Sequence, residues 1–205
     1  MFSIIQAAGW PIWPLLACSI LALALVIERF ISLKTTKITP PKLLEEVLLI
    51  SRNSVPVVDV IRQLEASSAM GEVLASGFRA LASNPRCAEE DLRSIMQGVG
   101  RLVAHRLERS LSALATIASA APLMGLFGTV VGMIEIFGSQ SPTGGNPAQL
   151  AHGISVALYN TAFGLIVAIP SLIFWRYFRS RVDAYLLTIE LAAERLVRHL
   201  NALRK

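Results

Sequence analysis

Charged residues are missing from three long stretches of this 205-residue sequence, which are residues 1–27, 110–134 and 136–175 with histidine counted as neutral. A membrane-spanning helix needs about 20 mostly apolar residues, so each stretch is long enough to cross a bilayer. The third stretch is too long for one helix, and the glycines and prolines within residues 138–147 predict a loop there. The sequence therefore predicts transmembrane helices over residues 14–31, 113–137 and 150–175.

Lysine and arginine are missing before the first predicted span and between the second and third spans. Twelve of the 19 basic residues lie between Arg29 and Arg109, and the other seven lie from Arg176 onward. Basic residues are retained on the cytoplasmic side of a membrane. We therefore predict a periplasmic N-terminus and a periplasmic loop, at residues 1–13 and 138–149, and two cytoplasmic parts, at residues 32–112 and 176–205.

A basic segment ahead of the first apolar stretch is also missing, which argues against a cleaved signal peptide. The charged pair Glu28 and Arg29 instead follows the apolar run. This order predicts an uncleaved anchor whose N-terminus faces outward. The net charge of +5 is explained by contact with anionic membrane lipid, so no nucleic-acid partner is predicted.

Cysteine is scarce, and the two cysteines fall in different layers. Cys18 lies in the first predicted span and Cys87 in the cytoplasmic part, which excludes a disulfide or a metal pair between them. The histidines are scattered, and the sequence has no nucleophile elbow, phosphate loop or metal-ligand spacing. We therefore predict that the protein is not an enzyme and holds no cofactor or metal.

The cytoplasmic part has the periodicity of helices. Short helices are predicted after the prolines at 40–41, over residues 57–64 and over residues 71–81. From about residue 88 the apolar spacing is helical again and meets no breaker before the second span, which predicts one helix over 88–137. The third span likewise continues past Arg176 as an amphipathic helix. The predicted fold is an all-α membrane protein whose two long helices extend into a cytoplasmic bundle.

Small residues are unusually frequent in the second and third spans. Gly128 and Gly132 form a GxxxG pair, which lets helix backbones approach closely. Packing within one chain explains part of this pattern, but one chain has too few helices for so many small faces, which favours a larger assembly. The candidate helix-packing residues are Pro122, Gly125, Gly128, Gly132, Ala157, Gly164 and Ala168.

Polar residues within the spans are candidates for function. Thr129 and Thr161 have small neighbours, and a threonine in a membrane helix often bonds to its own backbone instead of to a ligand. Glu135 lies near the outer end of the second span, where it is either interfacial or a protonated or hydrated acid. Asn160 precedes Thr161 and is less specific.

Several of these segments together resemble the ExbB/TolQ/MotA proton-channel family. Glu108-Arg109 and the segments LATIASAAP and GLFGTVVGM, at 114–122 and 125–133, resemble its second span. GISVALYNTAFGLIVAIP, at 153–170, resembles its third. Three spans with a large first cytoplasmic loop look like ExbB or TolQ, since MotA-type stators have four.

The resemblance implies a homo-oligomer, a pentameric ring, in the inner membrane of a Gram-negative bacterium. Spans 2 and 3 would line a pore holding two copies of an ExbD- or TolR-like single-span subunit, whose aspartate carries the proton. Thr129 and Thr161 map onto the family's pore threonines, and Asn160 and Glu135 join them as proton-pathway candidates. A TonB-like protein would carry the work to the outer membrane.

One position departs from the family pattern. Many ExbB and TolQ members have a glutamate where this sequence has Val156, five residues before Thr161. Glu135 could substitute as an outer-side acid. The alternatives are a TolQ-like role in envelope maintenance and a passive membrane scaffold, which the missing glutamate favours. An intramembrane enzyme has no supporting residues, and the transported cargo, an iron-siderophore or another substrate, stays open.

Overall fold

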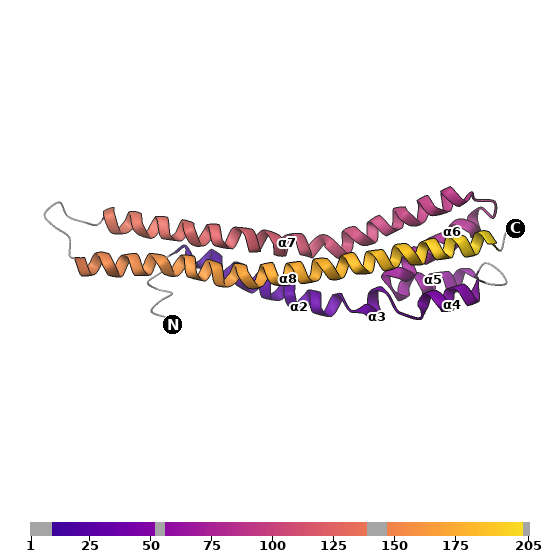
Figure 1. The fold of residues 1–205 in the computed structure, drawn as a ribbon, viewed down its shortest axis with the longest axis horizontal. Helices are drawn as coiled ribbons and strands as arrows, with labels where there is room; N and C mark the ends of the chain where they lie inside the picture. Colours follow the sequence, from indigo (N-terminus) through magenta and orange to yellow (C-terminus); the bar gives the residue numbers. More distant parts are fainter. Residues whose placement is uncertain (1–9, 52–55, 139–146, 203–205) are drawn as a thin grey trace. The chain divides into compact units, whose positions relative to one another are not determined.

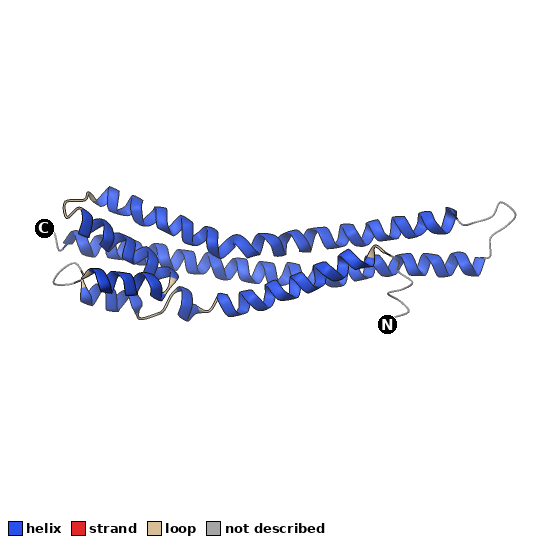
Figure 2. Cartoon of the chain, turned by 180° about the vertical axis from the view of Figure 1, so that it is seen from behind, coloured by secondary structure: helices blue, strands red, loops and turns tan. Residues whose placement is uncertain are grey.

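The structure is a computed structural model that describes residues 10–51, 56–138 and 147–202. Throughout these residues the regular structure is helical, without a strand (Figures 1 and 2), which confirms the predicted all-α fold. The helices are α2 (Ile12–Ser32), α3 (Thr35–Ile38), α4 (Leu43–Ile50), α5 (Val58–Ser67), α6 (Ala69–Ser83), α7 (Glu89–Gly138) and α8 (Pro147–Ala202).

Three of the described helices, α2, α7 and α8, are long and apolar enough to cross a membrane, as predicted. The third begins at Pro147, three residues before the predicted start, because a proline fits the first position of a helix. The proposed N-terminal segment 1–13 and loop 138–149 fall largely outside the described residues.

Helices α7 and α8 are continuous over 50 and 56 residues. Pro122 and Pro170 lie inside them without ending them. Prolines are tolerated in membrane helices because neighbouring groups satisfy the backbone carbonyls that they free. The unbroken helix predicted over 88–137 is therefore present, and the third span does continue past Arg176.

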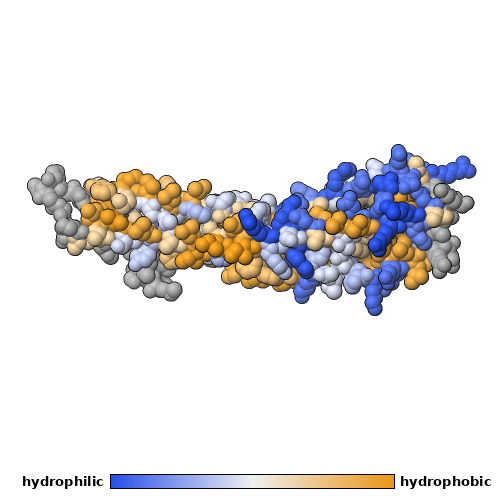
Figure 3. All heavy atoms as spheres, in the orientation of Figure 1, coloured by the Kyte–Doolittle hydropathy of each residue, from blue (hydrophilic) through white to orange (hydrophobic). Residues whose placement is uncertain are grey.

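The chain divides into two compact units, which we describe separately. The apolar unit comprises residues 1–28 and 110–177, and the charged unit comprises residues 29–109 and 178–205. Hydrophobic side chains gather over the first and hydrophilic side chains over the second (Figure 3). Each unit takes one part of α2, α7 and α8.

Three helices meet in the core of the apolar unit. Leu15 of α2 packs with Ala121 of α7 and with Val167 and Ala168 of α8, and all four are buried. The small alanines let the larger side chains of α2 approach the two long helices. This core fixes α2 against one side of the α7–α8 pair.

Helix α6 forms the centre of the charged unit. Its start is set by Ser68, whose Oγ accepts a hydrogen bond of 3.0 Å from the Gly71 N–H and caps the helix. Phe78 is fully buried, and Gly77 lies so close to Met96 of α7 that a Cβ would come within 2.8 Å of its sulfur. Helix α5 packs against α6.

Candidate functional site

Glycines of α7 form a close seam with α8 in the apolar unit. A Cβ built on Gly125 would lie 2.8 Å from the Asn160 carbonyl oxygen, and one on Gly128 would lie 2.8 Å from the Asn160 Cβ. A Cβ on Gly132 would lie 3.1 Å from the Ala157 Cβ. Since the residue numbers rise along α7 as they fall along α8, the two helices run antiparallel.

The remaining small residues extend this seam. A Cβ on Gly164 would lie 2.6 Å from the Ala121 carbonyl oxygen and 3.1 Å from the Gly125 Cα. Ala157 and Ala168 are buried, and Pro122 is half-buried. The structure thus brings the predicted packing glycines and alanines together within one chain, and Pro122 adjoins the seam residue Ala121 in the sequence.

Asn160 belongs to the seam by its position. Asn160 is 1% exposed. Its Cβ, Cγ and Nδ2 are the three atoms that would lie nearest to a Cβ built on Gly128. The absence of a side chain at Gly128 therefore makes room for this amide. Asn160 has a packing role that its place in the sequence did not reveal.

Thr129 and Thr161 lie on the same face of the α7–α8 pair. Thr129 follows the seam residue Gly128, and Thr161 follows the seam residue Asn160. One residue turns about 100° round a helix, always in the same sense along the chain. Gly128 and Asn160 face each other across the seam, and each threonine follows its seam residue by one position. Because the helices are antiparallel, this one-residue rotation turns both threonine side chains to the same side of the helix pair.

Helix α2 covers the opposite face of the pair. Leu15 of α2 belongs to the buried cluster of the apolar unit, and Met124 and Phe163 pack against this cluster. Met124 precedes the seam residue Gly125, and Phe163 precedes Gly164, so both turn away from the seam in the sense opposite to the threonines. The threonine face is therefore the face that α2 does not cover.

The Thr129 hydroxyl donates a hydrogen bond of 2.6 Å to the carbonyl of Leu126 on its own helix. The common behaviour of membrane threonines thus holds for Thr129 in this chain. A hydroxyl oxygen that donates one bond can still accept others. Thr161 is half-buried, which leaves part of its side chain accessible.

A surface groove of about 550 Å³ adjoins Thr129. Its lining residues are Thr129, Val130, Met133, Ile134, Phe137 and Gly138. Met133 and Phe137 are not among the site residues predicted from the sequence, although their spacing of four and eight residues from Thr129 places them along the same helix face.

Glu135 is not brought onto the threonine face. It is exposed, and it lies six residues beyond Thr129 on α7, which corresponds to about 9 Å of rise and about 240° of rotation. Val156 is half-buried on α8. Within the described residues, no group of three His, Cys, Asp or Glu side chains could hold a metal ion.

Comparison with known proteins gives a consistent result. Residues 65–191 match the MotA/TolQ/ExbB proton channel family. A Synechocystis protein named ExbB-like 3, described as a biopolymer transport protein, is 30% identical over 178 residues, covering 85% of this chain and 83% of its own. The Vibrio cholerae biopolymer transport protein exbB1 is 30% identical over 169 residues, covering 81% and 73%. The Tol-Pal system protein TolQ of Pseudomonas aeruginosa is 33% identical over 127 residues, covering 58% and 55%.

Proposed function

Because the chain belongs to the MotA/TolQ/ExbB proton channel family, we propose that it is the channel subunit of an inner-membrane motor. The motor couples the proton-motive force to energised transport across the outer membrane of a Gram-negative bacterium, through a TonB-like partner. The names of the Synechocystis and Vibrio relatives, biopolymer transport proteins, support a transport role.

The shared position of Thr129 and Thr161 carries this proposal. Both lie on the face of the α7–α8 pair that α2 leaves uncovered. In a ring of copies with α2 outside, this face lines a central pore. Two hydroxyls per copy then form rings of hydrogen-bonding groups in a space otherwise lined by apolar side chains such as Met133 and Phe137.

The pore is filled by a partner that brings the titrating acid. Glu135 lies off the threonine face, so this chain places no carboxylate beside Thr129 and Thr161 among its described residues. Two copies of an ExbD- or TolR-like single-span subunit, each with an intramembrane aspartate, supply that group in a pentamer of this chain. The hydroxyls would bond to the aspartate, or to water that carries the proton to it.

The driving energy is set by the membrane potential. One proton moving across 100 mV releases about 2.3 kcal/mol. Loss of charge on the aspartate changes its bonding to the threonine rings, and the inner helices can then rotate to the next copy. The one-sided lysines and arginines support a periplasmic position for the N-terminus and for the 138–149 loop.

A Tol-type role in envelope maintenance is the second candidate. The 33% identity to a protein named TolQ supports it, and the threonine face fits both roles equally. A passive scaffold is the third, since Val156 stands at the place of the family's glutamate. A scaffold would not need the hydroxyls.

The test is a Thr161→Val variant, which keeps the shape of the side chain and removes its hydroxyl. The variant, co-purified with its single-span partner, is reconstituted in vesicles, and proton flux is measured together with the mass of the intact complex. We expect an assembled complex with little proton flux. Thr116→Val is the matched control, because the Thr116 hydroxyl donates to its own helix at Ser112, on a different face.

Wild-type flux in Thr161→Val would contradict the channel role of this hydroxyl and favour the scaffold. Loss of flux in both variants would show a general effect of removing threonines. Failure of the wild-type chain to form a complex larger than one copy would contradict the ring itself.

A further inference from the structure

Two apolar stripes lie exposed on the charged unit. The α8 stripe consists of Leu187 and Leu191, which are 58% and 54% exposed. The α7 stripe consists of Ile95 and Leu102, which are 43% and 66% exposed. Single exposed leucines are ordinary, but two pairs at helical spacing on helices rich in charge need a partner surface.

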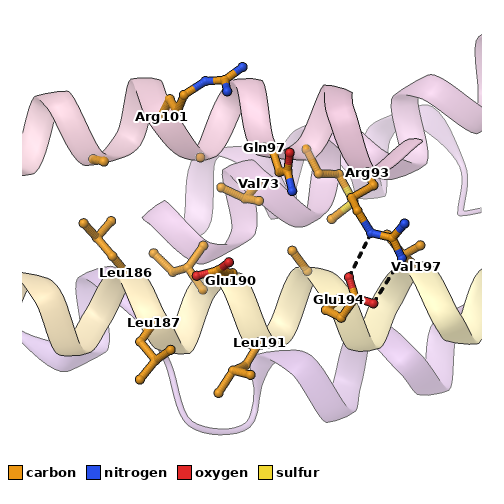
Figure 4. Close-up of a pocket in the computed structure, with 15 residues that line it drawn as sticks. Val73, Arg93, Gln97, Arg101, Leu186, Leu187, Glu190, Leu191, Glu194 and Val197 are labelled. Carbon is orange, nitrogen blue, oxygen red and sulfur yellow. Dashed lines mark hydrogen bonds and ion pairs between the residues drawn. The ribbon is translucent and has the colours of Figure 1, made fainter. Parts of the chain in front are cut away.

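The two stripes lie at the same level of the charged unit. Arg93 of α7 pairs with Glu194 of α8 at 3.1 Å (Figure 4), and Glu108 pairs with Arg179 at 3.1 Å further along both helices. The two ion pairs are separated by 15 residues on α7 and by 15 residues on α8. Each increase of one residue number along α7 therefore corresponds to a decrease of one along α8.

This register fixes which residues of the two stripes are level. Leu191 lies level with Met96, one residue from Ile95, and Leu187 lies level with Gly100, two residues from Leu102. Two residues correspond to about 3 Å of rise along a helix. The α8 stripe thus stands at the height of the α7 stripe.

The α8 stripe points away from α7. Leu187 and Leu191 are among the residues that line the groove between α7 and α8, but their side chains project from α8 on the side turned away from α7, whereas Glu190 points into the space between the two helices (Figure 4). That space is a groove of about 610 Å³ that also includes Gln97 and Gly100 of α7 in its lining.

The α7 stripe points away from α8 in turn. Ile95 lies two residues from both Arg93 and Gln97, which line the groove between the helices. A step of two residues turns about 200° round a helix, so Ile95 lies on the opposite side of α7 from the groove. Leu102 likewise lies two residues from Gly100 and from Ala104, which also line the groove, so it too lies on the side of α7 opposite the groove.

Opposite charges extend the two stripes at one end. Asp91 lies one helical turn before Ile95, and Arg195 lies one turn after Leu191. Both are exposed, and neither forms an ion pair with the part of the chain that the structure describes. The register places Arg195 level with Leu92, next to Asp91. Asp91 also lies in the first turn of α7, where a negative charge favours the helix.

We propose that the α7 stripe of one copy packs against the α8 stripe of the next copy, with Asp91 opposite Arg195. The partner is a second copy of this chain, because the two stripes are level, lie on opposite edges of the unit and end in opposite charges. Such a contact is heterologous, since each copy uses a different surface on either side. Without a shift along the helices, successive copies stay level, so the contact forms a closed ring where its rotation divides a full turn.

The proposal rests on the ring assembly of the proposed function and adds the residues that join its copies. Paired cysteines test it in cell membranes, in a full-length chain whose Cys18 and Cys87 are replaced by alanine. The pair is Ile95→Cys with Leu191→Cys in the same chain. We expect mild oxidation to link the copies into a ladder of dimers and larger species, which neither single variant forms beyond the dimer.

The matched control is Gln97→Cys with Leu191→Cys. Gln97 lies two residues from Ile95, about 3 Å along the helix, but faces the groove, so this pair should give no ladder. A charge exchange gives independent evidence. Asp91→Arg should weaken the oligomer in native mass spectrometry, and adding Arg195→Asp should restore it, whereas Glu90→Arg, in the same turn of α7, should have no effect.

The outcomes separate this interface from the proposed function. Intact oligomers without cross-linking of Ile95→Cys to Leu191→Cys would overturn the interface and leave the ring in place. Equal ladders from the Gln97 control would overturn it as well. A chain that stays monomeric with its partner present would overturn both the interface and the ring.

Discussion

Gly164 of α8 leaves no room for a side chain against Ala121 of α7, because a Cβ at position 164 would lie 2.6 Å from the Ala121 carbonyl oxygen. The opposing atom belongs to the helix backbone and cannot turn aside as a side chain can. A methyl group here must push the two helices apart. This contact makes Gly164 the most constrained position of the seam that sets the threonine face.

We predict that Gly164→Ala destabilises the protein. Overpacking a tight contact costs about 1–3 kcal/mol, which the better helix propensity of alanine, about 1 kcal/mol, offsets only in part. Thermal unfolding of the purified complex measures the change. Gly100→Ala is the control, since a Cβ there has nothing within 4 Å, and it should not lower the melting temperature. Equal melting temperatures for the two variants would contradict the seam.

The sequence predicted that the glycines of α7 pack closely, because GxxxG spacing places Gly128 and Gly132 on one face of their own helix. It could not predict what they would contact. Periodicity describes each helix separately, whereas the pairing of Gly128 with Asn160 depends on the register of α7 against α8. The sequence therefore predicts a place for Asn160 in the proton pathway, whereas in the structure its side chain fills the space beside a glycine.

Asn160→Ala provides the second prediction. The Asn160 side chain is buried against Gly128, so its removal leaves an unfilled space and should lower the free energy of unfolding by about 1–3 kcal/mol. Thermal unfolding of the complex tests this against Thr161→Val, a half-buried position that should change stability by less than about 0.5 kcal/mol. An Asn160→Ala complex of wild-type stability without proton flux would instead assign the amide to the proton pathway.

The faces of the helix pair show the same limit. The positions of Thr129 and Thr161 relative to their small neighbours were visible in the sequence. Their shared face was not, because it follows from the antiparallel seam and from the packing of α2 on Met124 and Phe163. The ion pairs between α7 and α8 could not be predicted from the sequence either. Many surface charges could pair, and only the register of the two helices selects among them.

Glu135 gives a third prediction, which concerns proton entry. It is exposed and lies off the threonine face near the C-terminal end of α7. If it passes protons from the periplasm toward the pore, Glu135→Gln should lower proton flux in vesicles without changing the melting temperature of the complex. Glu90→Gln, an exposed acid at the other end of α7, is the control. Unchanged flux in Glu135→Gln would remove Glu135 from the pathway.

The ion pair of Arg93 with Glu194 gives the charged unit a predictable response to acid. Hydrogen bonds from the Arg93 guanidinium lower the pKa of Glu194, against a smaller opposing effect of desolvation. The same bonds to Glu194 and Glu89 raise the pKa of Arg93, which stays charged throughout. The pair is partly exposed, so its contribution to stability is small.

A carboxylate with a lowered pKa in the folded state stabilises the fold above its unfolded-state pKa, which is about 4.3 for glutamate. That contribution is lost as the pH falls through the lower folded-state pKa of Glu194. The wild type should therefore lose more melting temperature than Glu194→Gln between about pH 5 and about pH 3. Glu90→Gln, which keeps the ion pair, should follow the wild type. Identical pH profiles for Glu194→Gln and the wild type would show that this ion pair does not join α7 to α8 in solution. That result would also contradict the register of α7 against α8 from which the levels of the two stripes are derived.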